Sequence, residues 1–301
     1  MHDPVTIARL QTIQEFRHCE LLQLSIWGAD PVEVSPADLL MTIHRHGGLV
    51  LGAFDAEARM IGFLFGFPGI TGADNPAAGK PGQLHHCSHA LGVIPEWQGK
   101  GVGFRLKLAQ RDWLLQQGTE LVTWTFDPLE SANAILNIGK LGAVSRCYLR
   151  DLYGTMPDAL NAGMPSDRLE VAWRIKGLRV HNRVVNGWQK LPAAELLRKG
   201  IPIVNPAIPH TDQPCEPGKY TIPGTSPVLA EIPYGIQSIK RRSNSLAKTW
   251  RMSIREVLES LFSRGYEIDD LVIDAGSGTQ RIYYLLRNVA PEQEFNFPPS
   301  R

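Results

Sequence analysis

The sequence predicts an α/β (α+β) protein, in which a mixed sheet carries helices on both faces and a C-terminal β-α-β-β extension follows. Two observations lead to this fold class. Helical and strand-like patterns of apolar residues alternate through residues 5–176, and a second, shorter series of such patterns follows a proline-rich stretch at residues 201–227. With 301 residues, the chain is long enough for one large domain or two modest ones.

The first series of elements begins with two helices and a hairpin. Apolar spacing predicts amphipathic helices at residues 12–27 and 36–46, with Ser35 placed to cap the second. Two apolar runs around a polar turn predict a hairpin, and a loop rich in glycine and proline comes next. The predicted strands are 49–54, 60–67, 85–93, 121–126, 143–149 and 169–175, and the two further helices are 101–117 and 131–141.

The chain changes character near residue 177. Seven prolines between residues 201 and 227 are too many for regular structure, so we expect an ordered connector that runs over the surface. Beyond it, the patterns predict a strand at 228–232, a helix at 245–264, and a hairpin of 266–273 with 281–286 around Gly276, Ser277 and Gly278. This divides the chain into a first domain (1–177), a Pro-rich connector (178–227), a C-terminal α/β unit (228–290) and a tail (291–301).

Composition and charge narrow the class of protein. Hydrophobic residues make up 43% and charged residues 20% of the chain, values typical of a soluble globular protein. The net charge of +1 argues against a protein that coats nucleic acid, and the apolar runs are far shorter than the roughly 20 residues of a membrane span. Four scattered cysteines and an N-terminus without a secretion signal predict a cytoplasmic protein with reduced thiols and no metal site.

A glycine-rich turn is the most informative stretch. The predicted strand that ends at Val93 leads through Gly99, Gly101 and Gly103 directly into a helix. Glycine lets several backbone N–H groups point at one spot, and the helix N-terminus adds its positive dipole end, so an anion such as a pyrophosphate can bind there. The spacing fits neither a P-loop nor the dinucleotide fingerprint, and a tight connection without a ligand is the alternative.

This segment resembles the acyl-CoA-binding motif of the GNAT superfamily of N-acyltransferases, Gln/Arg-x-x-Gly-x-Gly/Ala, which Gln98, Gly101 and Gly103 fill. The order of predicted elements also agrees, so the resemblance implies a GNAT-like, mostly antiparallel sheet and acetyl-CoA, or another acyl-CoA, as co-substrate. It further implies that the main chain of Leu91 and Val93 pairs with the pantetheine arm. The N–H groups expected to hold the pyrophosphate belong to Gly99, Lys100, Gly101, Val102, Gly103 and Phe104.

Charged and amide side chains near the turn are further candidates for the coenzyme. Lys100, Arg105 and Lys107 either meet its phosphates or are solvated charges. In GNAT proteins an Asn near the start of the next helix contacts the pantetheine, and Asn133 is the better match here.

His89 is the candidate catalytic residue. Strict alternation along the strand puts His85, Cys87, His89, Leu91 and Val93 on one face, which places His89 just upstream of the thioester. A neutral imidazole with a reference pKa of about 6.5 could accept a proton from an attacking ammonium. GNAT enzymes that act on amines often carry Glu or His near this position. A hydrogen-bonded structural histidine is the alternative.

One position departs from the pattern of the family. The sequence also leaves open which residues bind the acceptor. Many GNAT enzymes have a Tyr that protonates the departing thiolate, and the corresponding residue here is Ile138; Tyr148, Tyr153 or water could replace it. Arginine grips carboxylates through its bidentate fork, which makes Arg251 and Arg255 candidates for substrate binding. Their place beside an apolar helix stripe is equally typical of solvated edge residues.

The sequence therefore predicts an N-acyltransferase. It would move an acetyl or other short acyl group from CoA to a primary amine of a small molecule, such as an amino acid, by direct attack and without a metal. An N-succinyltransferase is the alternative for the donor. A non-catalytic acyl-CoA sensor, or an interaction module whose C-terminal unit docks a partner or completes a homodimer, are the alternatives from other classes. Neither nucleic acid nor a membrane is expected as a partner.

Overall fold

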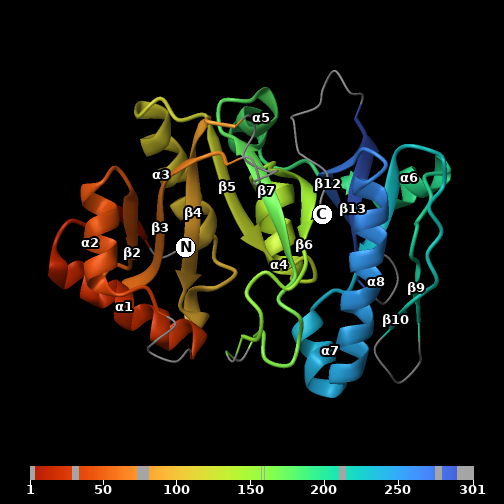
Figure 1. Cartoon of the computed structure of the whole chain (residues 1–301), viewed down its shortest axis with the longest axis horizontal. Coiled ribbons are helices and arrows are strands. Elements are labelled where there is room, and N and C mark those ends of the chain that lie inside the picture. The colour runs from red at the N-terminus through yellow and green to blue at the C-terminus, as the bar shows by residue number, and fades with distance from the viewer. Residues whose placement is uncertain are drawn as a thin grey trace.

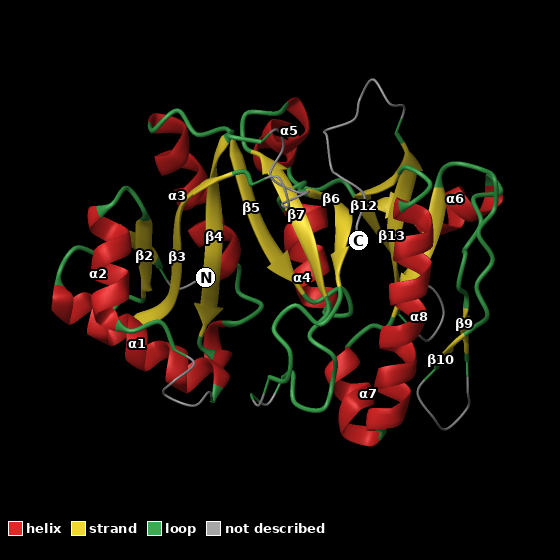
Figure 2. Ribbon diagram, in the orientation of Figure 1, coloured by secondary structure: helices red, strands yellow, loops and turns green. Residues whose placement is uncertain are grey.

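The computed structural model describes residues 4–28, 34–72, 81–156, 158, 160–209, 215–274 and 280–289. Its centre is one sheet in the strand order β1-β2-β3-β4-β5-β7-β6-β12-β13-β11, with β8 beside β12 (Figures 1 and 2). Within this described part, β4–β5 and β8–β12 pair in parallel, and the other named pairs of the sheet are antiparallel. The predicted fold class, a mixed and mostly antiparallel sheet flanked by helices, is confirmed.

The first seven strands have the order of elements that the GNAT resemblance implies. Helices α1 (Ile13–Trp27) and α2 (Ala37–Arg45) precede the β2–β3 hairpin, and α3 (Val102–Gln116) follows β4. The strands are β1 (Thr6–Arg9), β2 (Leu49–Phe54), β3 (Met60–Ile70), β4 (Leu84–Val93), β5 (Leu121–Phe126), β6 (Val144–Leu149) and β7 (Arg168–Arg174).

Alternation along the strands separates the two faces of this half of the sheet. Val50 and Phe63 pack with α1 and α2, whereas Leu51 and Leu64 pack with α3. Figure 1 shows α1 and α2 together at one end of the sheet. The two faces therefore have different neighbours, which decides where each side chain of β4 can act.

The N-termini of α1 and α2 are held by different hydrogen bonds. Thr12 and Glu15 form a reciprocal capping box at the start of α1. The cap expected from Ser35 is wrong: Pro36 is the N-cap of α2, and the side chain that accepts from its first turn is Glu20 of α1, whose carboxylate accepts from the N–H of Ala37 (2.9 Å). The backbone of Ser35 is instead held by Gln23 of α1, whose side-chain amide accepts from the Ser35 N–H (2.9 Å) and donates to its carbonyl (3.0 Å).

The helix predicted at residues 131–141 changes type partway. It begins as α4 (Ser131–Ala134) and continues as a π-helix, η3 (Ile135–Lys140). Gly139 packs closely against Trp188, since a Cβ at this glycine would lie 3.0 Å from the indole ring. The wider π-turn therefore occurs where another part of the chain presses on the helix.

The C-terminal half continues the same sheet. β12 pairs with β6 through Ile268 and Ser145, and β13 and β11 follow. The described residues of 178–227, a segment expected as a connector, contain two helices as well as three two-residue strands. The elements are α5 (Leu178–Asn186), β8 (Leu191–Pro192), α6 (Ala193–Arg198), β9 (Ala207–Ile208), β10 (Glu216–Pro217), β11 (Val228–Ile232), α7 (Ile236–Arg242), α8 (Asn244–Phe262), β12 (Tyr266–Asp274) and β13 (Arg281–Asn288).

One apolar core runs through both halves. The predicted apolar line of α8 is fully buried at Trp250, Ile254, Val257 and Leu261, and it belongs to the same cluster as Trp173 of β7. The division into four segments stays a prediction, and its turn at 276–278 and tail at 291–301 lie outside the described residues. Among the helices that are described, none is at once long and apolar enough to span a bilayer.

Candidate active site

The two parallel strands at the centre of the sheet separate after a short stretch of pairing. β4 and β5 pair only at residues 86–87 and 122–123, near the beginning of each strand. Further along, their ribbons diverge (Figure 1). Over residues 90–93, the edge of β4 that faces β5 therefore lacks a strand partner within the described parts of the chain.

The backbone groups of Leu91 and Val93 point to this open edge. The N–H of Ile94 donates to the carbonyl of Ile61 in β3 (3.0 Å), and successive residues of a strand direct their amides to opposite edges. The side-chain amide of Gln98 donates to the Val93 carbonyl at 2.9 Å, which fixes the turn against the end of the strand. Pairing of Leu91 and Val93 with pantetheine, and contact of Gln98 with the coenzyme, stay predictions.

The turn after β4 opens the N-terminus of α3. A short 3₁₀ turn, η2 (Pro95–Trp97), leads to Gly99 and Gly101, whose φ angles of +74° and +84° suit glycine alone without strain. Gly101 is the N-cap, and no side chain caps the helix. The first helical hydrogen bond runs from the N–H of Arg105 to the Gly101 carbonyl (3.1 Å), so the N–H groups of residues 102–104 lack an acceptor within the helix. Such a terminus suits a pyrophosphate.

Side chains around the turn divide between core and solvent. The side chain of Val102 is buried, and that of Phe104 is partly buried against the core. Lys100 is exposed, with Nζ 4.8 Å from the centroid of the Trp97 ring. A Cβ on Gly103 would touch Leu91 at an ordinary 3.4 Å, so this glycine is not required by space.

Lys107 lies away from the turn, and its expected contact with nucleotide phosphates is wrong. Its Nζ donates to the hydroxyl of Ser88 (2.8 Å) and lies 3.6 Å from the centroid of the Trp124 ring. Burial lowers the pKa of Lys107 well below its ordinary value. The residue is one helical turn beyond the N-terminal glycines, on the side of α3 that packs on the sheet.

A β-bulge in β4 breaks the alternation on which the sequence argument relied. Phe65 pairs with Ala90, whereas Phe67 pairs with Cys87, so β4 has one extra residue between these pairs. The single face expected for the odd-numbered residues 85–93 is therefore wrong. The odd-numbered residues of β4 before the bulge therefore face one side of the sheet, and those after it face the other side.

His89 lies on the face that α1 and α2 cover, opposite to Leu91 and Val93. Its ring centroid is 5.3 Å from that of Phe65 and 5.9 Å from that of Phe67, both in the cluster of α1 and α2. Leu91 and Val93 pack with α3. His89 is exposed at the open edge, yet burial by these rings lowers its pKa. A catalytic role for His89 stays a prediction, now from the opposite face.

Thr125 and Glu170 lie on the same face as His89, across the divergence. Cys87 pairs with Thr123, and two residues further along these strands are His89 and Thr125. Thr125 in turn pairs with Glu170 of β7. The structure thus brings an imidazole, a hydroxyl and a carboxyl group to one face of the sheet where β4 and β5 separate.

Sequence reasoning missed Glu170. This residue is only 9% exposed on an apolar strand, and burial raises the pKa of its carboxyl group to about 7. The available signal was a single carboxylate between Leu169 and Val171, where alternation puts it on the face opposite to those two apolar side chains. A buried carboxyl group with a raised pKa beside an open strand edge is a functional-site candidate.

The raised pKa of Glu170 predicts a stability that falls as pH rises. The carboxyl group of Glu170 binds its proton more tightly in the folded state than in the unfolded state. The unfolding free energy of the protein therefore falls as pH rises from the unfolded pKa, 4.5, to the folded pKa of about 7. We therefore expect Glu170→Gln to raise the unfolding free energy at pH 8 by up to about 3 kcal/mol. Urea unfolding at pH 4.5 and pH 8 checks this, with the exposed Glu96→Gln as control. An equal effect of Glu170→Gln at both pH values would contradict it.

Of the two tyrosines considered as replacement acids, Tyr153 lies nearer to this face. Ile138, at the usual position of the acid, is fully buried. Tyr148 is also buried, its hydroxyl donates to Asp167 (2.7 Å), and burial raises its pKa. Tyr153 is 53% exposed, and its hydroxyl lies 3.1 Å from that of Thr125.

The two helix asparagines differ in exposure. Asn133 is exposed on α4, whereas Asn137 is 5% exposed within the π-helix. Contact of Asn133 with pantetheine stays a prediction.

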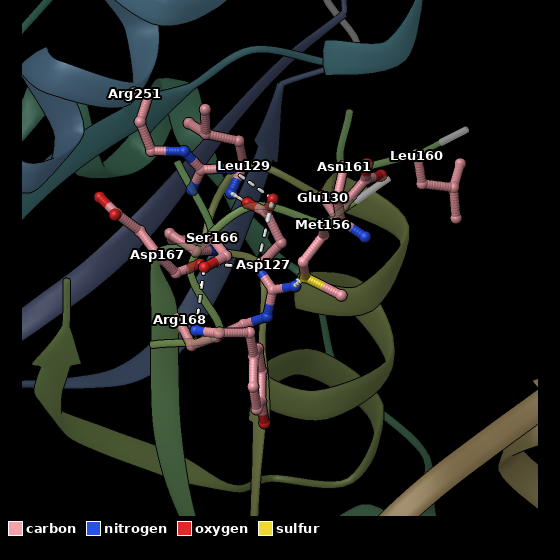
Figure 3. Close-up of polar contacts among 12 residues, drawn as sticks. Asp127, Leu129, Glu130, Met156, Leu160, Asn161, Ser166, Asp167, Arg168 and Arg251 are labelled. Atoms are coloured by element: carbon pink, nitrogen blue, oxygen red, sulfur yellow. Dashed lines mark hydrogen bonds and ion pairs between the residues drawn. The ribbon is translucent and has the colours of Figure 1, made fainter. Parts of the chain in front are cut away.

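Arg251 and Arg255 have carboxylate partners inside the protein, so neither is a solvated edge residue. The guanidinium of Arg251, 1% exposed, pairs with Asp127, the residue after β5 (Figure 3). Arg255 donates two hydrogen bonds to Asp167, at 2.7 and 2.8 Å. Although burial opposes it, hydrogen bonds from Arg255 and Tyr148 lower the pKa of Asp167. Both arginines attach α8 to the first half of the chain, and their binding of a substrate carboxylate stays a prediction.

Asp127 and Glu130, which lie just before α4, also have partners outside that helix. Asp127 accepts from the N–H of Leu129 (2.8 Å) as well as from Arg251. Glu130 is the N-cap of α4, but its side chain accepts from Gln237 of α7 (2.6 Å) and does not cap the helix.

The cysteines and the metal-binding residue types supply no further chemistry at this site. Burial raises the pKa of Cys87, which disfavours a thiolate nucleophile. Within the described ranges, no group of three or more His, Cys, Asp or Glu side chains is arranged to hold a metal ion.

Comparison with known proteins gives structural matches and no sequence match. No protein-family model and no curated protein sequence matches the chain. The ribosomal-protein-S18-alanine N-acetyltransferase of Escherichia coli is 15% identical, with 58% of this chain and 96% of that chain covered and a TM-score of 0.43. The ribosomal-protein-S5-alanine acetyltransferase of Vibrio fischeri is 17% identical, with 58% and 94% covered and a TM-score of 0.40. A GCN5-related glucosamine N-acetyltransferase region of a fungal multi-domain GH3 β-N-acetylglucosaminidase is 17% identical, with 40% of this chain and 13% of that chain covered and a TM-score of 0.32.

Proposed function

We propose that the protein is an N-acyltransferase that moves an acetyl or other short acyl group from CoA to a primary amine of a small molecule. The observation that carries this proposal is the open backbone edge of β4, which leads into a glycine-rich helix N-terminus. The pantetheine arm of CoA is an extended chain with two amide groups, which can pair with such an edge, and the pyrophosphate beyond it can then reach the N–H groups of residues 102–104.

The chemistry requires little beyond positioning and one proton acceptor. The amine nitrogen attacks the thioester carbon, the C–S bond breaks, and the CoA thiolate leaves. His89, whose lowered pKa keeps it neutral at pH 7, takes the proton from the attacking ammonium. Tyr153 or water returns a proton to the thiolate. Within the chain, we propose residues 1–177 as the acyl-CoA-binding part, while the C-terminal unit walls the acceptor side.

Calorimetric titration with acetyl-CoA and succinyl-CoA tests the proposal and chooses the donor. We expect one thioester to bind, and that donor then serves in a screen of primary amines with detection of free CoA thiol. Binding without turnover on any amine would favour the alternative of an acyl-CoA sensor. If neither thioester binds, the proposed function is wrong.

Replacement of His89 separates catalysis from binding. We expect His89→Gln to lower kcat by roughly 100- to 10,000-fold, because a general base contributes about that factor. Affinity for the acyl-CoA should stay unchanged, since the imidazole lies on the face opposite to Leu91 and Val93. The exposed His18→Gln on α1 is the matched control. Steady-state kinetics give the result, and wild-type kcat in His89→Gln would assign His89 a structural role.

A further inference from the structure

Glu170 provides a carboxyl group on the proposed acceptor face that the proposed mechanism does not use. It lies on β7 and pairs with Thr125 of β5, and His89 of the diverging β4 lies beyond Thr125. Burial first, and then the charge of Glu170, raise the pKa of Cys87, which is two positions before His89 on β4. The carboxyl group is therefore close enough to act across β5 on the strand that carries the proposed proton acceptor.

The carboxyl oxygens of Glu170 have no partner in the described parts of the chain, and they are open to solvent. No described residue forms a hydrogen bond or an ion pair with them, and burial alone raises the pKa of this group. Polar atoms that lack a partner and are sealed from solvent occur elsewhere in the protein, but neither oxygen of Glu170 is one of them. A carboxyl group that is 9% exposed, unpaired and still reachable is suited to a ligand with a positive charge.

The arginine nearest to Glu170 along β7 has other partners. Arg168 is 7% exposed, and its guanidinium donates to a backbone carbonyl (3.0 Å) and to the side chain of Asn161 (3.1 Å) (Figure 3). The residues paired with Glu170 on the neighbouring strands, Thr125 and Cys147, carry no positive charge. The charge that would compensate an ionised Glu170 is therefore not supplied by these neighbours, and a ligand can supply it.

We infer that Glu170 binds a second, positively charged amino group of the acceptor, so that the acceptor is a diamino compound. This inference rests on the proposed function. One amino group loses its proton at His89 and attacks the thioester, while the other stays an ammonium and donates hydrogen bonds to Glu170. Paired strands lie about 4.8 Å apart, so β4 and β7, with β5 between them, are separated by roughly 10 Å. A chain of several carbon atoms can link the two nitrogens over this distance.

A plain diamine and a diamino acid share this chemistry, and two matched pairs of amines distinguish them. Pentylamine is cadaverine without its second amino group, and norleucine is lysine without it. We expect kcat/KM to be about tenfold to 100-fold higher for the diamino member of a pair, because a hydrogen bond between charged groups contributes that factor. The pair with the higher kcat/KM shows whether the acceptor also carries a carboxylate.

Replacement of Glu170 tests the same interaction from the side of the protein. Glu170→Gln keeps the shape of the side chain and removes its charge, so the ratio of kcat/KM between the members of each pair should fall close to one. Glu57→Gln replaces an exposed glutamate in the turn between β2 and β3, and it should leave both ratios unchanged. Thermal melting confirms that both variants fold.

The outcomes separate this inference from the proposed function. Failure of both thioesters to bind overturns the proposed function. Thioester binding with equal use of cadaverine and pentylamine, and of lysine and norleucine, overturns the inference alone. Ratios that stay unchanged in Glu170→Gln overturn it too, because the ammonium would then be held elsewhere. If acyl-CoA binds without turnover, calorimetric titration of the four amines in the presence of CoA decides by the same ratios, now of affinity.

Discussion

Asp127→Ala should lower the unfolding free energy by about 3–5 kcal/mol, because it leaves the buried guanidinium of Arg251 without its carboxylate. Arg251 is 1% exposed, and its Nε and Nη1 atoms already lack hydrogen-bond partners among the described residues. Asp127 is therefore the group that compensates a charge inside the core. The same carboxylate accepts a hydrogen bond from the N–H of Leu129, so Asp127→Ala also removes a contact that fixes the loop after β5. Urea unfolding at pH 7 measures the loss.

A surface ion pair provides the control for this effect. Lys199 and Glu195 are exposed and one helical turn apart, and pairs of this kind are worth at most about 1 kcal/mol. Lys199→Ala should therefore change stability very little. One double variant tests the origin of the loss: Arg251→Met combined with Asp127→Ala should recover part of it, because replacing both charges removes the uncompensated one. A small loss for Asp127→Ala alone, similar to that for Lys199→Ala, would contradict the argument.

Elements with strong local patterns could be predicted, because their signal lies within a few residues. The apolar line from Trp250 to Leu261 repeats at helical spacing, and its residues are fully buried. The strand–turn–helix at residues 85–117 needed only the glycines and the apolar residues on either side. The order of the elements followed from these patterns and from the GNAT resemblance.

What could not be predicted depends on distant or irregular contacts. The bulge in β4 depends on pairing with β3, and alternation alone placed His89 on the same face as Leu91. The pairing of Arg251 with Asp127 joins residues 124 positions apart, which no spacing rule addresses. The same holds for Ile268 of β12, whose pairing with Ser145 joins the C-terminal strands to the first sheet.

The bulge changes the functional argument as well as the geometry. Without the bulge, the side chain of His89 would lie on the α3 face together with those of Leu91 and Val93. The backbone of these two residues forms the strand edge proposed for the coenzyme. With the bulge, His89 faces the side of α1 and α2, together with Thr125 and Glu170. An amine that approaches from this side would meet a proton acceptor while the thioester is held by the backbone edge, so donor and acceptor need not compete for one face.

Gly101→Glu should weaken acyl-CoA binding by roughly 100- to 1,000-fold. A carboxylate about 4 Å from a phosphate at a protein surface is repelled by about 4 kcal/mol, and it would stand at the N-terminus of α3. A Cβ at Gly101 meets nothing within 4 Å, so the side chain itself fits, and the strain comes only from the φ angle of +84°. Calorimetric titration with the preferred thioester measures the loss.

Gly118→Glu is the matched control, because it reproduces the strain and the charge at the other end of the same helix. Gly118 has a φ angle of +75°, and a Cβ there also meets nothing within 4 Å. Both variants should lose similar thermal stability, but only Gly101→Glu should lose the coenzyme. If the two bind acyl-CoA equally well, the glycine turn is a tight connection and the coenzyme must be held elsewhere. If both lose it, the effect is strain transmitted through α3 and not repulsion at the turn.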